Sequence, residues 1–200
     1  MVQQHPSSFH PDLTEDRLRI IAQKLLDIRH DTLQQMTNAY DDNYTRECAA
    51  FGRQRNMLVD FCKTSGYPWL ELTNPNMDIT FNIGEVPCRF FRDDPNSPSK
   101  PGFFKRNAVD NLFPVDDKSP VQFRFIVEKA LGEEDEDQVY FVGYNELHEQ
   151  VFQWKYRKPT SILHELNGTV PEAVQIPEPE VNPLDDEETI THNNIDASQQ

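Results

Sequence analysis

The stretch VQFRFIVEKAL, residues 121–131, alternates apolar and polar side chains with a period of two. This period predicts a β-strand, because successive side chains of a strand point to opposite faces of the sheet. Phe123 and Phe125 belong to the apolar set and are expected to face the core. Gln122 and Arg124 belong to the polar set and are expected to face water.

Neighbouring segments extend this strand into a sheet. The polar run GEEDEDQ (132–138) predicts a turn, the apolar run VYFVGY (139–144) a central strand, and QVFQWKYR (150–157) a further strand. The segment DITFNIGEVPCRFF (78–91) predicts a hairpin around Gly-Glu, with its second strand at a sheet edge because Pro87 lacks a backbone donor. Strands joined by short turns run antiparallel, so we expect an antiparallel β-meander of about five strands.

The first third of the chain shows a helical period instead. Thr14 is a candidate N-cap, and apolar residues then recur at spacings of three and four. A second stripe follows the YDDNY segment (40–44) and ends before Gly66. We predict a helical pair over residues 13–66 rather than one continuous rod, because the first stripe loses its register near Thr32.

These elements predict an α+β fold in which the helical pair packs on one face of the sheet. We expect residues 1–12 to be disordered, residues 67–166 to form the sheet region of the same domain, and residues 167–200 to be a disordered acidic tail. From residue 165 onward there are nine acidic residues and no Lys or Arg, within a chain of net charge -15. This acidity argues against direct nucleic-acid binding.

Targeting signals and cysteine usage point to the cytoplasm. The sequence shows no cationic stretch followed by an apolar core at its start, and no apolar run near the roughly 18 residues that span a bilayer. Cys48, Cys62 and Cys88 form no CxxC pair and are expected to be reduced and buried. We therefore predict a cytoplasmic protein without membrane insertion.

A search for chemistry finds no catalytic, metal-binding or cofactor-binding motif. The histidines lack metal-ligand spacing, and there is no glycine-rich phosphate loop or nucleophile motif. Glu128 and Lys129 are adjacent on a strand, so they point to opposite faces and cannot share a metal site. The sequence therefore predicts no catalytic residue, no metal and no cofactor, and favours a non-enzymatic role.

The long connector between two strands, from Arg92 to Ser119, is the candidate partner-binding segment. Connectors of this length inside a domain are usually functional or partly structured. It carries the stretch SKPGFFKRN (99–107), in which cations accompany paired aromatic rings. The candidate partner-binding residues are Arg92, Lys100, Phe103, Phe104, Lys105 and Arg106. A competing interpretation makes Phe103 and Phe104 core residues and the cations solvated.

From these features we predict a non-enzymatic interaction or regulatory protein that binds another protein. Two alternatives are a small metal-dependent hydrolase or nuclease and an acidic mimic of DNA that inhibits a nucleic-acid-binding protein. A homodimer formed through the helical pair is a further prediction about partners. An enzyme would show a polar cleft with converging carboxylates, an interaction protein an exposed apolar patch, and a DNA mimic rows of surface acids.

Overall fold

The computed structural model describes residues 4–105, 119–130, 132 and 135–158. All of them belong to the first of two units, residues 1–159. The predicted tail, residues 167–200, lies outside the described residues. Along the chain the elements are a 3-10 helix η1 (Pro6–Ser8), the helices α1 (Glu15–Gln35) and α2 (Asn43–Lys63), and the strands β1 (Leu70–Asn74), β2 (Thr80–Ile83), β3 (Val86–Arg92), β4 (Gln122–Glu128), β5 (Gln138–Tyr144) and β6 (Gln150–Lys155).

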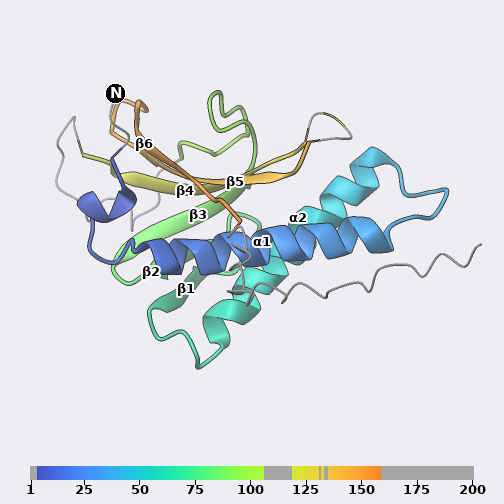
Figure 1. Cartoon of the computed structure of the whole chain (residues 1–200), viewed down its shortest axis with the longest axis horizontal. Coiled ribbons are helices and arrows are strands. Elements are labelled where there is room, and N and C mark those ends of the chain that lie inside the picture. Colours follow the sequence, from blue (N-terminus) through green and yellow to red (C-terminus); the bar gives the residue numbers. More distant parts are fainter. Residues whose placement is uncertain (1–3, 106–118, 131, 133–134, 159–200) are drawn as a thin grey trace, which may run out of the picture. The chain divides into compact units, whose positions relative to one another are not determined.

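The helical pair is confirmed as two separate helices (Figure 1). The Thr14 hydroxyl accepts a hydrogen bond from the Arg17 backbone N–H at 3.4 Å, which caps α1. The Asp42 carboxylate accepts one from the Thr45 N–H at 2.7 Å, which caps α2. Each cap satisfies a backbone donor at a new helix start, so the chain turns between the helices rather than forming a rod. Neither helix of the described residues has the length and apolarity to cross a bilayer.

The described strands form one six-stranded sheet in the order β1-β2-β3-β4-β5-β6. Two predictions about the sheet were wrong. First, the sheet has a sixth strand, β1, for which we predicted no strand segment. Second, β3 and β4 pair in parallel, whereas every other neighbouring pair is antiparallel. Parallel strands must begin at the same end of the sheet. The connector between β3 and β4 is long enough to bring the chain back to the end at which β3 begins.

Pro87 lies on a central strand, not on the edge strand that we predicted. It pairs with Asn82 of β2, and the pairing of β3 with β4 begins only one residue later, at Cys88 opposite Phe123. At Pro87 the strand therefore has a neighbour on one side only. Because β4 does not pair with β3 at this position, the missing N–H of proline breaks no interstrand hydrogen bond, and proline is tolerated in this strand.

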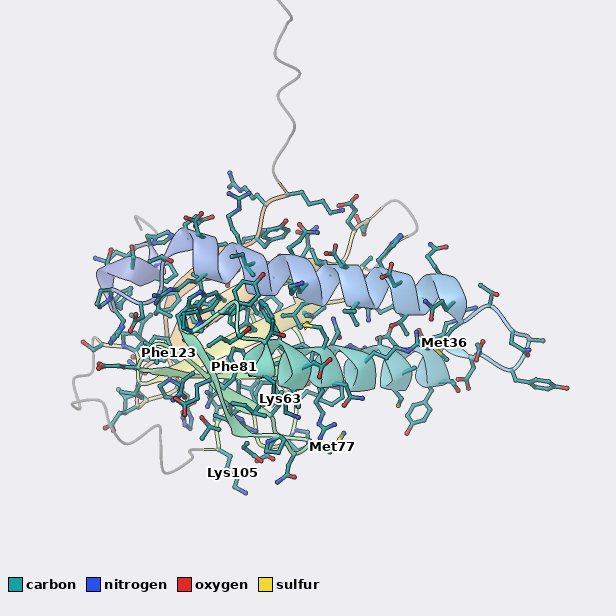
Figure 2. All side chains as sticks on the ribbon, turned by 90° about the horizontal axis from the view of Figure 1, so that it is seen from below. Met36, Lys63, Met77, Phe81, Lys105 and Phe123 are labelled. Atoms are coloured by element: carbon teal, nitrogen blue, oxygen red, sulfur yellow. The ribbon has the colours of Figure 1, made fainter. Side chains whose placement is uncertain are left out.

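One face of the sheet packs against both helices and forms the main core (Figure 2). Phe81 and Phe123 point into this core, as does Phe125, whose ring centroid lies 4.6 Å from that of Phe141. Phe125 and Phe141 are fully buried, so the predicted register of β4 and β5 is correct. The alternation in the sequence therefore correctly predicted which side chains of β4 face the core that the helices cover.

The opposite face of β4 is also buried, contrary to the prediction that its polar residues face water. Gln122 and Arg124 are 0% exposed because the connector after β3 covers them. Their side chains donate to the backbone carbonyl oxygens of Phe104 and Phe103, respectively, both at 3.2 Å. Both faces of β4 are therefore covered, and its buried polar side chains are satisfied by backbone carbonyl oxygens of the connector.

We predicted disorder for residues 1–12, whereas the structure places residues 6–8 in η1, against β6. The ring of Phe9 stacks on that of Phe152 of β6, with 5.1 Å between centroids. Pro6 is buried as well. These apolar contacts anchor a segment whose composition is otherwise typical of a turn-rich terminus.

Candidate functional site

A groove of about 510 Å³ lies between α2 and the C-terminal end of β3. We call it the strand-edge groove. One wall is a single face of α2, since its residues are spaced at three and four positions. The other walls come from β3, the β1–β2 turn and the connector after β3. The lining residues are Tyr44, Glu47, Cys48, Phe51, Met77, Asp78, Arg89, Phe90, Phe91, Arg92, Lys100 and Pro101.

The groove follows a part of β3 that has no strand on one side. Pairing with β2 stops at Arg89, opposite Thr80, whereas pairing with β4 continues to Arg92. Within the described residues, positions 90–92 of β3 therefore have a strand neighbour on one edge only. Phe90 itself is only 3% exposed, whereas Phe91 and Arg92 are half-buried, so the groove opens beside the last two residues of β3.

Exposed apolar side chains gather around this edge. Tyr44 is 76% exposed and Met77 is 68% exposed, and Figure 2 shows Met77 at the periphery near α2. The floor is formed by Phe51 and Phe90, whose rings stack with centroids 5.4 Å apart. Cys48 is exposed in the same wall, which corrects the prediction that all three cysteines are buried. It is exposed because this face of α2 turns away from the sheet core.

A buried ion network forms the inner end of the groove. Arg29 of α1 is 1% exposed, and its guanidinium donates to Glu47 at 3.0 and 3.1 Å and to Asp137 at 2.7 Å. Arg92 of β3 forms a close ion pair with the same Glu47 carboxylate. The network joins α1, α2, β3 and the segment before β5, and so fixes the groove wall relative to the strand edge.

Arg92 stays charged at neutral pH despite its burial. Burial and the nearby Arg29 cation lower the pKa of Arg92 to about 10, while Asp137 opposes the decrease. A pKa of about 10 still lies well above neutrality, so the guanidinium holds its proton there. Lys129 adds a further cation, with its Nζ 3.9 Å from Glu47 Oε1. Around Glu47 the cationic side chains thus outnumber the anionic ones.

The structure separates the predicted partner-binding residues into two groups. Arg92 and Lys100 line the strand-edge groove. Phe103 is 1% exposed in a second apolar cluster beneath the connector, and Phe104 packs against it and stacks on the ring of His148. Lys105 is exposed but does not line the groove. The sixth predicted residue, Arg106, lies outside the described residues.

Sequence reasoning missed the residues that make this groove apolar, namely Tyr44, Cys48 and Met77. Tyr44 and Cys48 belong to the apolar stripe of the second helix, and we expected the helical pair to pack on the sheet. The stripe is wider than the surface that the sheet covers, so its N-terminal end is left exposed. Met77 lies in a turn, where one apolar residue gives no periodic signal.

Other clefts and residue clusters give less support for a binding site. A groove of about 750 Å³ between α1 and α2 is lined mainly by residues of polar or charged type, and the guanidinium of Arg53 in it donates to Gln35 at 2.7 Å. In the part of the chain that the structure describes, no group of three or more His, Cys, Asp or Glu residues is placed to hold a metal ion. The Asp93 carboxylate accepts hydrogen bonds from the backbone N–H groups of Ser99 and Lys100.

Comparison with known proteins gives no relative: no protein-family model, no curated protein and no solved structure matches this chain.

Proposed function

We propose that this is a non-enzymatic interaction protein that binds another protein through the strand-edge groove. One observation carries the proposal: exposed Tyr44 and Met77 flank a stretch of β3 that pairs on one edge only. Aromatic residues and methionine are enriched in protein interfaces, where they supply large contact areas. The groove places such residues beside the point where β2 ends.

The physical cost of leaving this surface in water supports the proposal. Exposed apolar residues are common singly, but a cluster of them beside a groove invites nonspecific association. Burial under a partner would remove this apolar area from solvent. The rigid walls, held by the Arg29–Glu47–Asp137 network, keep the groove formed before any partner arrives.

Site-specific photo-crosslinking tests the proposal. The photoreactive amino acid p-benzoylphenylalanine replaces Tyr44 in one variant and Leu147 in a matched control. Leu147 is 63% exposed, in the turn between β5 and β6, and does not line the groove. We expect cells of the source organism to yield an adduct of one defined mass from position 44 and none of that mass from position 147. Adding Met77→Glu to the position-44 variant should abolish the adduct.

Two results would contradict the proposal. Identical adducts from both positions would indicate nonspecific contact, and an adduct that survives Met77→Glu would place the contact outside the groove. Met77 is largely exposed, so its substitution should leave the free energy of unfolding within about 0.5 kcal/mol of the parent. A urea melt of the variant checks that loss of the adduct is not loss of the fold.

A further inference from the structure

A serine, a histidine and a glutamate contact one another near the start of the described chain, outside the strand-edge groove. His5 precedes the 3-10 helix η1, which contains Ser7, and Glu15 is the first residue of α1. The Nδ1 atom of His5 lies 2.7 Å from the Oγ atom of Ser7, and its Nε2 atom lies 2.9 Å from Oε2 of Glu15. A nucleophile beside a base that a third group orients is the arrangement that activates serine in acyl transfer.

The hydrogen bonds assign the proton of the neutral His5 ring to one nitrogen. The backbone N–H of Ser7 donates to Nδ1 at 3.1 Å, so Nδ1 is an acceptor and its lone pair faces Ser7. The ring proton is then on Nε2, which donates it to the Glu15 carboxylate. In this tautomer the imidazole can take the proton of the Ser7 hydroxyl as a general base.

Packing holds both ends of this cluster in place. The ring of Phe9 stacks on that of Phe152, which keeps η1 against β6. The Glu15 carboxylate also accepts a hydrogen bond at 2.7 Å from the indole N–H of Trp154, which is largely buried. Ser7 itself is exposed, so its hydroxyl is open to small molecules in solution.

The backbone donors around Ser7 are already used within η1. The N–H of Ser7 donates to the His5 ring, and the N–H of Ser8 donates to the His5 carbonyl oxygen. The N–H of Phe9 donates to the carbonyl oxygen of Pro6. Efficient turnover of an acyl-serine needs donors directed at the oxyanion that forms on the acyl group. We therefore expect Ser7 to accept an acyl group readily and to release it slowly.

We propose that Ser7 is a covalent acylation site, which takes one acyl group from an activated ester. The Ser7 Oγ attacks the ester carbonyl carbon while its proton passes to Nδ1 of His5. The C–O bond to the leaving group then breaks, and the imidazolium gives that proton to the departing oxygen. Glu15 is a positioning residue whose charge stabilises the imidazolium. A cavity of about 270 Å³, lined in part by His5 and Glu15, leaves room for a small donor beside the base.

Acetylation of the full-length protein by p-nitrophenyl acetate tests the proposal, with peptide mass spectrometry to measure the rate at each serine. Ser8 is the internal reference, because it is exposed in the same helix but is not hydrogen-bonded to the His5 ring. General-base assistance should make acetylation of Ser7 at least tenfold faster than that of Ser8. Equal rates at the two serines would overturn the proposal.

Two substitutions separate activation of Ser7 from a purely structural role of its neighbours. His5→Asn keeps a side-chain acceptor at the start of η1 but removes the base, and should slow acetylation of Ser7 at least tenfold. Glu15→Gln keeps the shape but removes the charge, and should also slow it. Acetylation of Ser8 should change less than twofold in both variants. Parent-like acetylation of Ser7 in His5→Asn would overturn the proposal.

The amount of nitrophenol released separates this proposal from the proposed function. We expect Ser7→Ala to remove one equivalent per chain, and Ser8→Ala to remove almost none. Release of many equivalents that is lost in Ser7→Ala would show turnover, and would contradict both the single acylation and the non-enzymatic function. Failure of Ser7 to react would overturn the acylation site alone, because binding in the strand-edge groove is measured independently by crosslinking from position 44.

Discussion

Glu47 is the residue on which the buried ion network depends, and replacing it predicts a large loss of stability. Its carboxylate accepts from two nitrogens of Arg29 and pairs with Arg92. In Glu47→Ala, Arg29 keeps only Asp137 as an anionic partner among the described residues while its side chain stays 1% exposed. The variant therefore leaves a buried guanidinium with half of its compensating charge.

The expected loss in the free energy of unfolding follows from the burial of this ion pair. Breaking a buried ion pair by removing one partner costs about 3–5 kcal/mol, because the remaining charge is not rehydrated. Glu47→Gln keeps the shape and one acceptor oxygen, so we expect it to cost about 1.5–3 kcal/mol, the value of one hydrogen bond to a charged group. For a chain of this length, each kcal/mol lowers the melting temperature by about 2–4 °C.

Urea unfolding followed by circular dichroism measures both effects. Glu71→Ala is the matched control, because Glu71 is exposed on β1 and should change the free energy of unfolding by less than about 0.5 kcal/mol. The difference between Glu47→Ala and this control should persist in 1 M NaCl, since buried pairs are poorly screened. If the two variants have equal midpoints, the network does not hold the helices to the sheet, and our reasoning is refuted.

Two further predictions concern the core and the alkaline limit of stability. Phe125→Ala should lower the free energy of unfolding by about 3–5 kcal/mol in a urea melt, because its fully buried ring leaves a cavity beside Phe141; a parent-like midpoint would contradict the assigned register. Burial raises the pKa of Tyr144 to about 12, against about 10 in the unfolded chain, so the unfolded state loses this proton first and stability falls between about pH 10 and 12. In Tyr144→Phe this part of the decrease should be absent, which urea melts of both proteins at pH 8 and pH 11 would detect; parallel decreases would contradict the assignment.

The fold was predictable where local patterns decide it. Strict alternation identified β4, a capping residue identified the start of α1, and the apolar stripes identified both helices. The strand β1 was missed because it is short, lies between Pro68 and Pro75, and has Leu70 as its only fully buried side chain. The parallel pairing of β3 with β4 was missed because it depends on the path of the connector, which no local period encodes.

The candidate site was predictable only in part. The connector indicated Arg92 and Lys100, which line the groove, but the same reasoning included Phe103, whose side chain fills the second face of the sheet. Tyr44 was missed because an apolar stripe predicts burial along its whole length. Which end of the stripe reaches past the sheet depends on the lengths of β2 and β3, and these are known only from the tertiary structure.

Backbone hydrogen exchange around the strand-edge groove tests the proposed binding surface, because it reports on the residues that a partner would cover. We expect rapid exchange of the amide of exposed Met77 in the free protein, and slowing of at least tenfold when the partner captured at position 44 binds. The amide of Cys88, which faces β2, should be slow in both states. Unchanged exchange at Met77 on binding would contradict the proposal that a partner binds in this groove.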